Sequence, residues 1–240
     1  MPVFQLRNEI VFPPPEFAEE KGLLAVGGDL SEERLLVAYS KGIFPWYLEG
    51  SPILWWSPDP RLVLLPGEVK VSRSLRQTIK NGVFRVTMDN AFDEVIRGCA
   101  ETHKGKDRET WITDEMIEAY LKLHHSGYAH SVESWYGKEL AGGLYGLSLG
   151  ASFFGESMFT RRTDASKVAF VSLVRQLIHW NFEFIDCQVT TGHLISLGAK
   201  EIPRCEFLRM LRHALKADTR RGRWVCPPAT LREVGWGGGA

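Results

Sequence analysis

The fold is decided by residues 128–189, which begin with YAHSVESWYGKELAGGLYGLSLGASFFGESMF at 128–159. This part is rich in aromatic and aliphatic residues and is interrupted at Gly137-Lys138 and at Gly150, which predicts a meander of three strands. It is followed by ASKVAFVSLVRQLIHW, apolar on most sides and therefore predicted to be a buried helix, and by the strand sequence FEFIDCQV. The predicted elements are strands 128–136, 139–149 and 151–159, a helix over 165–180 and a strand over 182–189.

Weaker patterns on either side add further elements. Ser72 and Thr113 are predicted helix N-caps, and Asp89 or Asn90 is predicted to cap a helix that runs through Cys99. From residue 83 onward the predicted order is β, α, α, three strands, α, β, α, which resembles the acyltransferase fold of the GNAT type. No Q/R-x-x-G-x-G/A pyrophosphate loop precedes the helix at 165, so this analogy suggests acyl transfer without the usual acyl-CoA donor.

The first sixty residues have a different composition, dense in Pro, Gly and Trp. They leave room for one helix, capped by Asp29 or Ser31 and closed by Gly42. The sequence therefore predicts an α+β protein with a small N-terminal α/β subdomain and a larger GNAT-like domain of mixed sheet flanked by helices. The expected boundaries are 1–62 for the subdomain, 63–228 for the catalytic domain and 229–240 for a flexible tail.

Composition excludes several classes of protein. The 240 residues are 44% hydrophobic, and 29 Lys and Arg balance 29 Asp and Glu, so neither a disordered chain nor one that coats nucleic acid through overall charge is expected. Four scattered cysteines argue against a disulfide framework. No window has the ~20 apolar residues of a membrane helix and no secretory signal is evident, so a cytoplasmic protein without membrane contact is expected.

The strand 182–189 contains a candidate reacting pair. Alternation places Asp186 and Gln188 on one face with Phe184, and Ile185, Cys187 and Val189 on the other. Buried polar side chains need partners; a functional pair and a polar strand end satisfied by loop backbone are about equally favoured. Glu156, among apolar neighbours, also needs a partner. Ser157 fails the G-x-S-x-G pattern of a hydrolase, because Phe159 replaces the second Gly.

Other charged and aromatic patterns are less specific. Arg73, Arg76 and Lys80 share one helix face, which suits a phosphate track, although a solvated face is the more common explanation. A second basic stretch covers residues 200–223. Trp55 and Trp56 are expected to pack internally. The histidines and cysteines show no tight metal spacing, so a metal site is not expected.

Several longer motifs together identify a resemblance. They look like the bacterial leucyl/phenylalanyl-tRNA–protein transferases from about residue 4 to about residue 225, in the order GLLAVGGDL (22–30), KGIFPW (41–46), ILWWSPDPR (53–61), TWIT (110–113), GESMF (155–159) and IDCQ (185–188). The resemblance implies transfer of Leu or Phe, and Met more weakly, from aminoacyl-tRNA to the α-amine of proteins that begin with Arg or Lys. Such products enter N-degron proteolysis. No cofactor is implied, and we expect a monomer.

The resemblance also implies roles for individual residues. Asp186 would attract the acceptor's cationic N-terminus, Gln188 would hydrogen-bond the amine or the ester carbonyl, and Glu156 would anchor the aminoacyl-adenosine or the acceptor. The implied aminoacyl pocket comprises Leu144, Phe153, Met158, Phe170, Leu173 and Ile185. The 3′-adenosine would contact Trp46, Trp111 and Tyr120, and the tRNA backbone would contact Arg73, Arg76 and Lys80.

Two alternatives stay open. One is a GNAT-type N-acetyltransferase that uses acetyl-CoA, which the missing pyrophosphate loop and the Trp-rich N-terminal part disfavour. The other is a non-catalytic RNA- or peptide-binding module, which the pair Asp186 and Gln188 disfavours.

Overall fold

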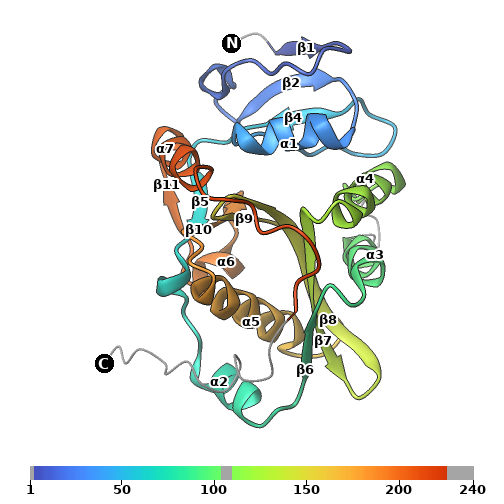
Figure 1. Cartoon of the computed structure of the whole chain (residues 1–240), viewed down its shortest axis with the longest axis vertical. Coiled ribbons are helices and arrows are strands. Elements are labelled where there is room, and N and C mark those ends of the chain that lie inside the picture. The colour runs from blue at the N-terminus through green and yellow to red at the C-terminus, as the bar shows by residue number, and fades with distance from the viewer. Residues whose placement is uncertain (1–2, 104–109, 226–240) are drawn as a thin grey trace.

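The chain folds around two sheets. The structure, a computed structural model, describes residues 3–103 and 110–225. The first sheet has the order β1-β2-β4-β3, and α1 (Glu32–Ser40) lies against it at the top of Figure 1. Its strands are β1 (Phe4–Leu6), β2 (Leu23–Gly27), β3 (Phe44–Pro45) and β4 (Leu54–Trp56), with a 3-10 turn at Pro15–Phe17.

The second sheet has seven strands in the order β11-β5-β10-β9-β8-β7-β6. All neighbours are antiparallel except β9 and β10, which run parallel. This parallel pair follows from the helix between them, because parallel neighbours need a crossover connection. The strands are β5 (Arg61–Leu64), β6 (Arg85–Met88), β7 (Ala129–Tyr136), β8 (Glu139–Leu149), β9 (Ser152–Thr160), β10 (Phe184–Gln188) and β11 (Lys200–Ile202).

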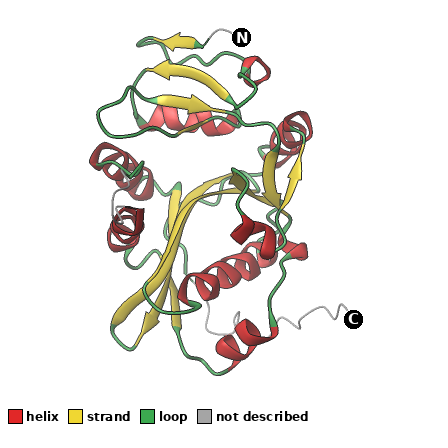
Figure 2. Ribbon diagram, turned by 180° about the vertical axis from the view of Figure 1, so that it is seen from behind, coloured by secondary structure: helices red, strands yellow, loops and turns green. Residues whose placement is uncertain are grey.

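Helices cover both faces of the larger sheet, as the view from behind shows (Figure 2). The crossover helix α5 packs its buried apolar residues against one face, and α3, α4 and α7 cover the other. The side chains of β10 alternate between the two cores: Phe184 joins the core under α7, and Ile185 and Cys187 join the core under α5. The helices are α2 (Arg73–Lys80), α3 (Phe92–His103), α4 (Asp114–His125), α5 (Ala165–His179), α6 (Gly192–Ser196) and α7 (Arg204–Ala214).

Most local predictions are confirmed. The fold is α+β, the three-stranded meander and the buried helix are present, and Ser31, Ser72 and Thr113 cap their helices. The predicted cap at Asp89 or Asn90 is wrong: α3 begins at Phe92, and the Asp89 carboxylate instead accepts the N–H groups of residues 131 and 224. The short strands β5 and β11 were not predicted, because three or four residues are too few to show a period.

The N-terminal sheet meets the larger sheet at a close contact beside α7. Gly42 has a φ of +72°, and a Cβ atom there would lie 2.7 Å from the ring of Phe207 on α7. Glycine therefore serves both the backbone conformation and the close approach. The contact brings the following residues, up to Trp46, to the edge of the larger sheet where β5 begins and β10 ends.

Two other expectations concern thiols and membranes. Cys99 and Cys187 are buried free thiols and Cys205 is an exposed one, whereas Cys226 and the predicted tail 229–240 lie outside the described residues. In the described ranges, no helix combines the length and apolar character needed to cross a membrane.

Candidate active site

A cavity of about 360 Å³ opens where β9 and β10 part. The two strands pair in parallel only as far as Phe154 opposite Asp186. Beyond that point Gly155–Met158 of β9 and Cys187–Val189 diverge and line the cavity. Helices α5 and α6 close one side, and the segment Phe44–Trp46 of the N-terminal sheet closes the other.

One end of the cavity is apolar. The structure brings together all six residues that the family resemblance implied for an aminoacyl pocket, although they come from three strands and one helix. The ring of Phe153 has room because the neighbouring strand carries glycine at position 146. A Cβ atom at Gly146 would lie 2.6 Å from that ring. The six lining residues are Leu144, Phe153, Met158, Phe170, Leu173 and Ile185.

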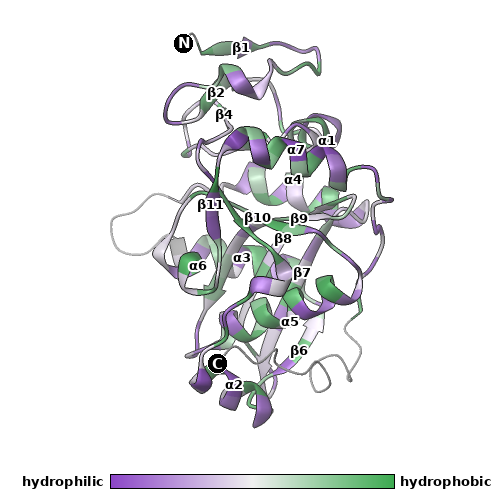
Figure 3. Cartoon of the chain, turned by 90° about the vertical axis from the view of Figure 1, so that its left-hand side faces the viewer, coloured by the Kyte–Doolittle hydropathy of each residue, from purple (hydrophilic) through white to green (hydrophobic). Residues whose placement is uncertain are grey.

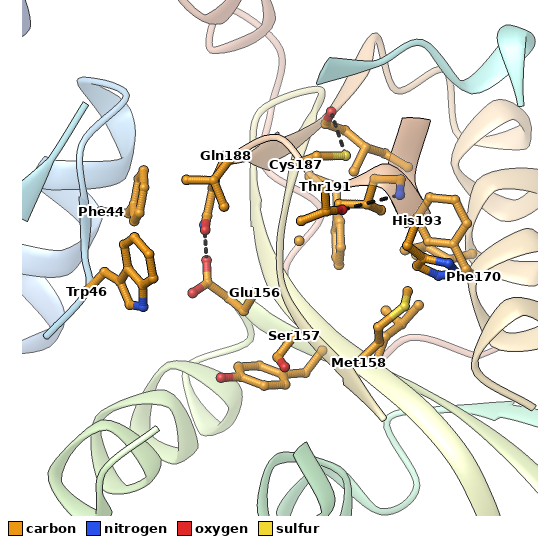
Figure 4. Close-up of a pocket in the computed structure, with 18 of the residues that line it drawn as sticks. Phe44, Trp46, Glu156, Ser157, Met158, Phe170, Cys187, Gln188, Thr191 and His193 are labelled. Carbon is orange, nitrogen blue, oxygen red and sulfur yellow. Dashed lines mark hydrogen bonds between the residues drawn. The ribbon is translucent and has the colours of Figure 1, made fainter. Parts of the chain in front are cut away.

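The other end of the cavity holds a buried carboxyl group with three donors. Tyr39 donates to Glu156 Oε1 over 2.7 Å, Tyr120 donates to Oε2 over 2.9 Å, and the Gln188 side-chain amide donates to Oε1 over 2.8 Å. Figure 4 shows the pair of Glu156 and Gln188 between the rings of Phe44 and Trp46 on one side and the apolar wall on the other.

The pKa of this carboxyl group lies close to neutral pH. The pKa of Glu156 is raised to about 7: burial is the largest cause, the hydrogen bonds from the tyrosines and Gln188 oppose it, and the charge of Asp186 adds to the rise. Burial, followed by the charge of Glu156, raises the pKa of Tyr39 and Tyr120 well above the ordinary value, so both phenols stay protonated donors. The two phenol oxygens also contact each other. The oxygens of Tyr39, Tyr120 and Glu156 therefore make three contacts with one another, but the two phenols supply only two protons. A proton on Glu156 supplies the third.

Asp186 lies behind the cavity and is not among its lining residues. It is fully buried and accepts two bonds from Arg61, Nε to Oδ1 at 2.8 Å and Nη2 to Oδ2 at 2.6 Å. Its Oδ1 also accepts the backbone N–H of Gln188 over 2.9 Å. Arg61 already balances this charge, so the position of Asp186 does not support the predicted attraction of the acceptor's cation.

The backbone turns sharply after Asp186. Gln188 has a φ of +62°, and the register with β5 shifts between Asp186 and Gln188. This left-handed residue ends the strict alternation, and Val189 packs with the core under α7 and not with Ile185 as predicted. The turn directs the Gln188 side chain to Glu156.

The three aromatic residues implied for adenosine differ in position. Trp46 and Trp111 line the cavity, and Trp46 is 41% exposed at its edge. Tyr120 is fully buried and its hydroxyl is used by Glu156, so its predicted contact with adenosine is not supported by its position. Trp56 packs against Trp46, and Trp55 is buried with its indole N–H on the carbonyl of Gly27, as the packing interpretation predicted.

The basic helix is remote from the cavity. Arg73, Arg76 and Lys80 are exposed on α2, which is held by the buried side chain of Leu75. This helix is at the end of the molecule opposite the N-terminal sheet and carries hydrophilic, purple segments in Figure 3. None of the three lines the cavity.

Sequence reasoning missed several residues of the site. Tyr39 is part of an apolar helix face and gives no sign of a polar role. The sequence does offer a sign of a buried partner at Arg61, because this charged residue directly precedes the apolar residues 62–64 in the same buried strand. The cavity is also lined by Val189, Thr191, His193 and Leu194. Within the described chain, no three His, Cys, Asp or Glu side chains are grouped to hold a metal ion.

Comparisons with known proteins agree across the chain. A family model described as leucyl/phenylalanyl-tRNA protein transferase matches residues 63–212, and a model of the N-terminal domain of the same proteins matches residues 28–59. Curated proteins named leucyl/phenylalanyl-tRNA–protein transferase are similar over most of both chains. That of Syntrophobacter fumaroxidans is 63% identical, covering 88% of this chain and 90% of its own. That of an Anaeromyxobacter species is 59% identical (93% and 95%), and that of Solidesulfovibrio magneticus is 58% identical (96% and 93%).

Proposed function

The chain belongs to the leucyl/phenylalanyl-tRNA–protein transferase family, and we propose that it transfers Leu or Phe, and Met more weakly, from aminoacyl-tRNA to the α-amine of proteins that begin with Arg or Lys. The observation that carries the proposal is one cavity with an apolar end beside a buried carboxyl and amide. Aminolysis of an ester needs these two surfaces together, one for the amino-acid side chain and one for the amine.

The apolar end is the proposed site of the aminoacyl side chain. Its six named residues are uncharged, and Met158 is an adaptable side chain that can fit Leu, Phe or Met. Substrates branched at Cβ place a methyl group against the rigid strand wall. A misplaced methyl or methylene costs about 1–3 kcal/mol, which is enough for a tenfold or larger preference.

The rest of the donor is proposed to follow the edge of the cavity. Trp46 and Trp111 offer aromatic faces on which the 3′-adenine can stack. Arg73, Arg76 and Lys80 on α2 are proposed to contact the tRNA backbone, which needs no sequence recognition. Tyr120 is not part of this proposed adenosine contact, because its hydroxyl donates to Glu156.

The polar end is proposed to handle the acceptor's proton. An α-ammonium group has a pKa of about 7.7–8.0, close to the value of about 7 for Glu156, so a proton can pass between them with little cost. The free amine then attacks the ester carbonyl, a C–N bond forms, and the C–O bond to the terminal ribose breaks. The ribose oxygen leaves with the proton that the attacking nitrogen gives up as the amide forms, and Gln188 orients the reacting groups.

Organisation and location are part of the same proposal. We propose an N-terminal subdomain 1–62, a catalytic domain 63–228 and a tail 229–240. Support for the first boundary is the change from one sheet to the other between β4 and β5. We propose that the protein is a cytoplasmic monomer that supplies an N-degron pathway. The cytoplasm is where aminoacyl-tRNA and proteins that begin with Arg or Lys meet.

A transfer assay tests the proposal. Purified protein is mixed with leucyl-tRNA carrying labelled Leu and with a model protein that begins with Arg, or with a matched protein that begins with Ala. We expect label on the Arg protein alone. Label on neither, with folded enzyme and intact aminoacyl-tRNA, would overturn the proposal, and labelled acetyl-CoA would then be tried as the donor.

A further inference from the structure

A buried ion pair supports the site from behind. The guanidinium of Arg61 faces Asp186 with two parallel N–H bonds of 2.8 and 2.6 Å, and neither side chain is exposed by more than 1%. The same guanidinium lies between the rings of Phe44 and Phe207, 4.8 and 4.5 Å from their centres. Arg61 therefore fixes Asp186 in orientation as well as in charge.

This fixed carboxylate holds the backbone at the mouth of the cavity. Asp186 Oδ1, which accepts Arg61 Nε, also accepts the backbone N–H of Gln188 over 2.9 Å. Gln188 is left-handed with φ +62°, a conformation that costs free energy for a residue other than glycine. The bond to Asp186 offsets that cost. The Gln188 side chain then reaches Glu156, and Phe44, stacked on Arg61, lines the cavity wall.

We propose that Arg61 is a positioning residue for the transfer reaction: it holds Asp186 as the acceptor that keeps Gln188 left-handed and aimed at the reacting centre. Asp186 then acts through the backbone of Gln188 and not as a free anion for the acceptor amine. This inference rests on the proposed function for its kinetic effect. Its structural part, the dependence of Gln188 on Arg61, stands without it.

Lysine cannot replace Arg61 in this role. A single ammonium group cannot make two parallel bonds to one carboxylate and lacks the flat face that lies between Phe44 and Phe207. Arg61→Lys keeps the charge of the pair and removes its geometry. Arg34→Lys is a matched control, since Arg34 is also fully buried and binds carbonyl groups of residues 7–9, away from the cavity.

The structural test uses backbone amide signals. The chain has four glutamines, at 5, 77, 176 and 188, so selective ¹⁵N-glutamine labelling gives a simple spectrum. We expect Arg61→Lys to shift the Gln188 amide signal while those of Gln77 and Gln176 stay in place, and Arg34→Lys to leave Gln188 unmoved. An unchanged Gln188 signal in Arg61→Lys would overturn the inference, whatever the protein's activity.

The kinetic test separates positioning from loss of fold. In Arg61→Lys we expect kcat to fall at least tenfold, while KM for leucyl-tRNA stays within threefold of that of the unaltered protein. In Arg34→Lys we expect kcat to be unchanged, even if its melting temperature falls as much as that of Arg61→Lys. A fall confined to KM, or equal losses in both variants, would overturn the positioning role. Absence of transfer in the unaltered protein would instead overturn the proposed function and leave the amide test standing.

Discussion

The side-chain amide of Gln188 donates to Glu156 over 2.8 Å from the point where two parallel strands separate. The two residues come from different strands, and Figure 4 shows their bond between the aromatic edge and the apolar wall. Behind them, Tyr39 and Tyr120 complete the environment of the carboxyl group. The site is therefore a proton-bearing group held at the border of an apolar pocket.

Stability should depend on pH through Glu156. Its pKa is raised from 4.5 to about 7 in the folded chain, so between these values the native state binds a proton that the unfolded state has released. The free energy of unfolding should therefore decrease as pH rises from about 4.5 to about 7, by roughly 3 kcal/mol in total. Urea unfolding across this range, compared between the unaltered protein and Glu156→Gln, measures the effect.

The matched control is Glu133→Gln, which alters another fully buried carboxyl group on β7, away from the cavity. It should keep the pH dependence that Glu156→Gln removes. Equal slopes in the unaltered protein and in Glu156→Gln would contradict the assignment.

Removing either tyrosine hydroxyl should shift the titration of the site upward. Hydrogen bonds from Tyr39 and Tyr120 lower the pKa of Glu156 against the effect of burial. In Tyr39→Phe and Tyr120→Phe the carboxyl group keeps its proton to higher pH, so the midpoint of the rising limb of kcat against pH should move up. Tyr47→Phe is the control, because its hydroxyl contacts Glu115 and not Glu156. A midpoint unmoved by both cavity variants would exclude Glu156 as the titrating group.

The size of the apolar end should set the preference between leucine and phenylalanine. Leu173→Phe fills space in the cavity wall, and we expect the ratio of kcat/KM for phenylalanyl-tRNA over leucyl-tRNA to fall about tenfold, equivalent to ~1.4 kcal/mol. Leu177→Phe enlarges a buried side chain one turn further along α5 that does not line the cavity. It should lower stability without changing the ratio. The same ratio in both variants would place the amino-acid side chain elsewhere.

The basic face of α2 should contribute to tRNA binding through salt-dependent contacts. Each phosphate contact adds about 0.9 to the slope of log affinity against log salt, so Arg73→Gln with Lys80→Gln should reduce that slope by roughly 1–2. Arg97→Gln removes another exposed arginine, paired with Asp93 on α3, and should leave the slope unchanged. Filter binding of leucyl-tRNA at several salt concentrations gives the slopes. A slope unaffected by the α2 variant would remove this helix from the tRNA site.

Much of the local structure was predictable, because it depends on neighbours along the chain. Caps at Ser31, Ser72 and Thr113 need residues three positions away, and alternation along β10 as far as Cys187 sets which core each side chain joins. Several residues of the cavity were also predictable from the sequence. Family motifs named its six apolar residues, and Glu156 stood out as a carboxyl group among apolar neighbours that needed partners.

What the sequence by itself determined is the order of strands and helices, the apolar faces and the residues on which the family resemblance depends. What only the tertiary structure decided is the partner of each buried polar group. Arg61 and Asp186 are 125 positions apart, and Tyr39 and Glu156 are 117 apart. Local periodicity describes burial but not which distant strand or helix supplies the counter-charge or the donor. Those pairings are set by packing of the two sheets, and they determine which carboxylate is neutralised and which one faces the cavity.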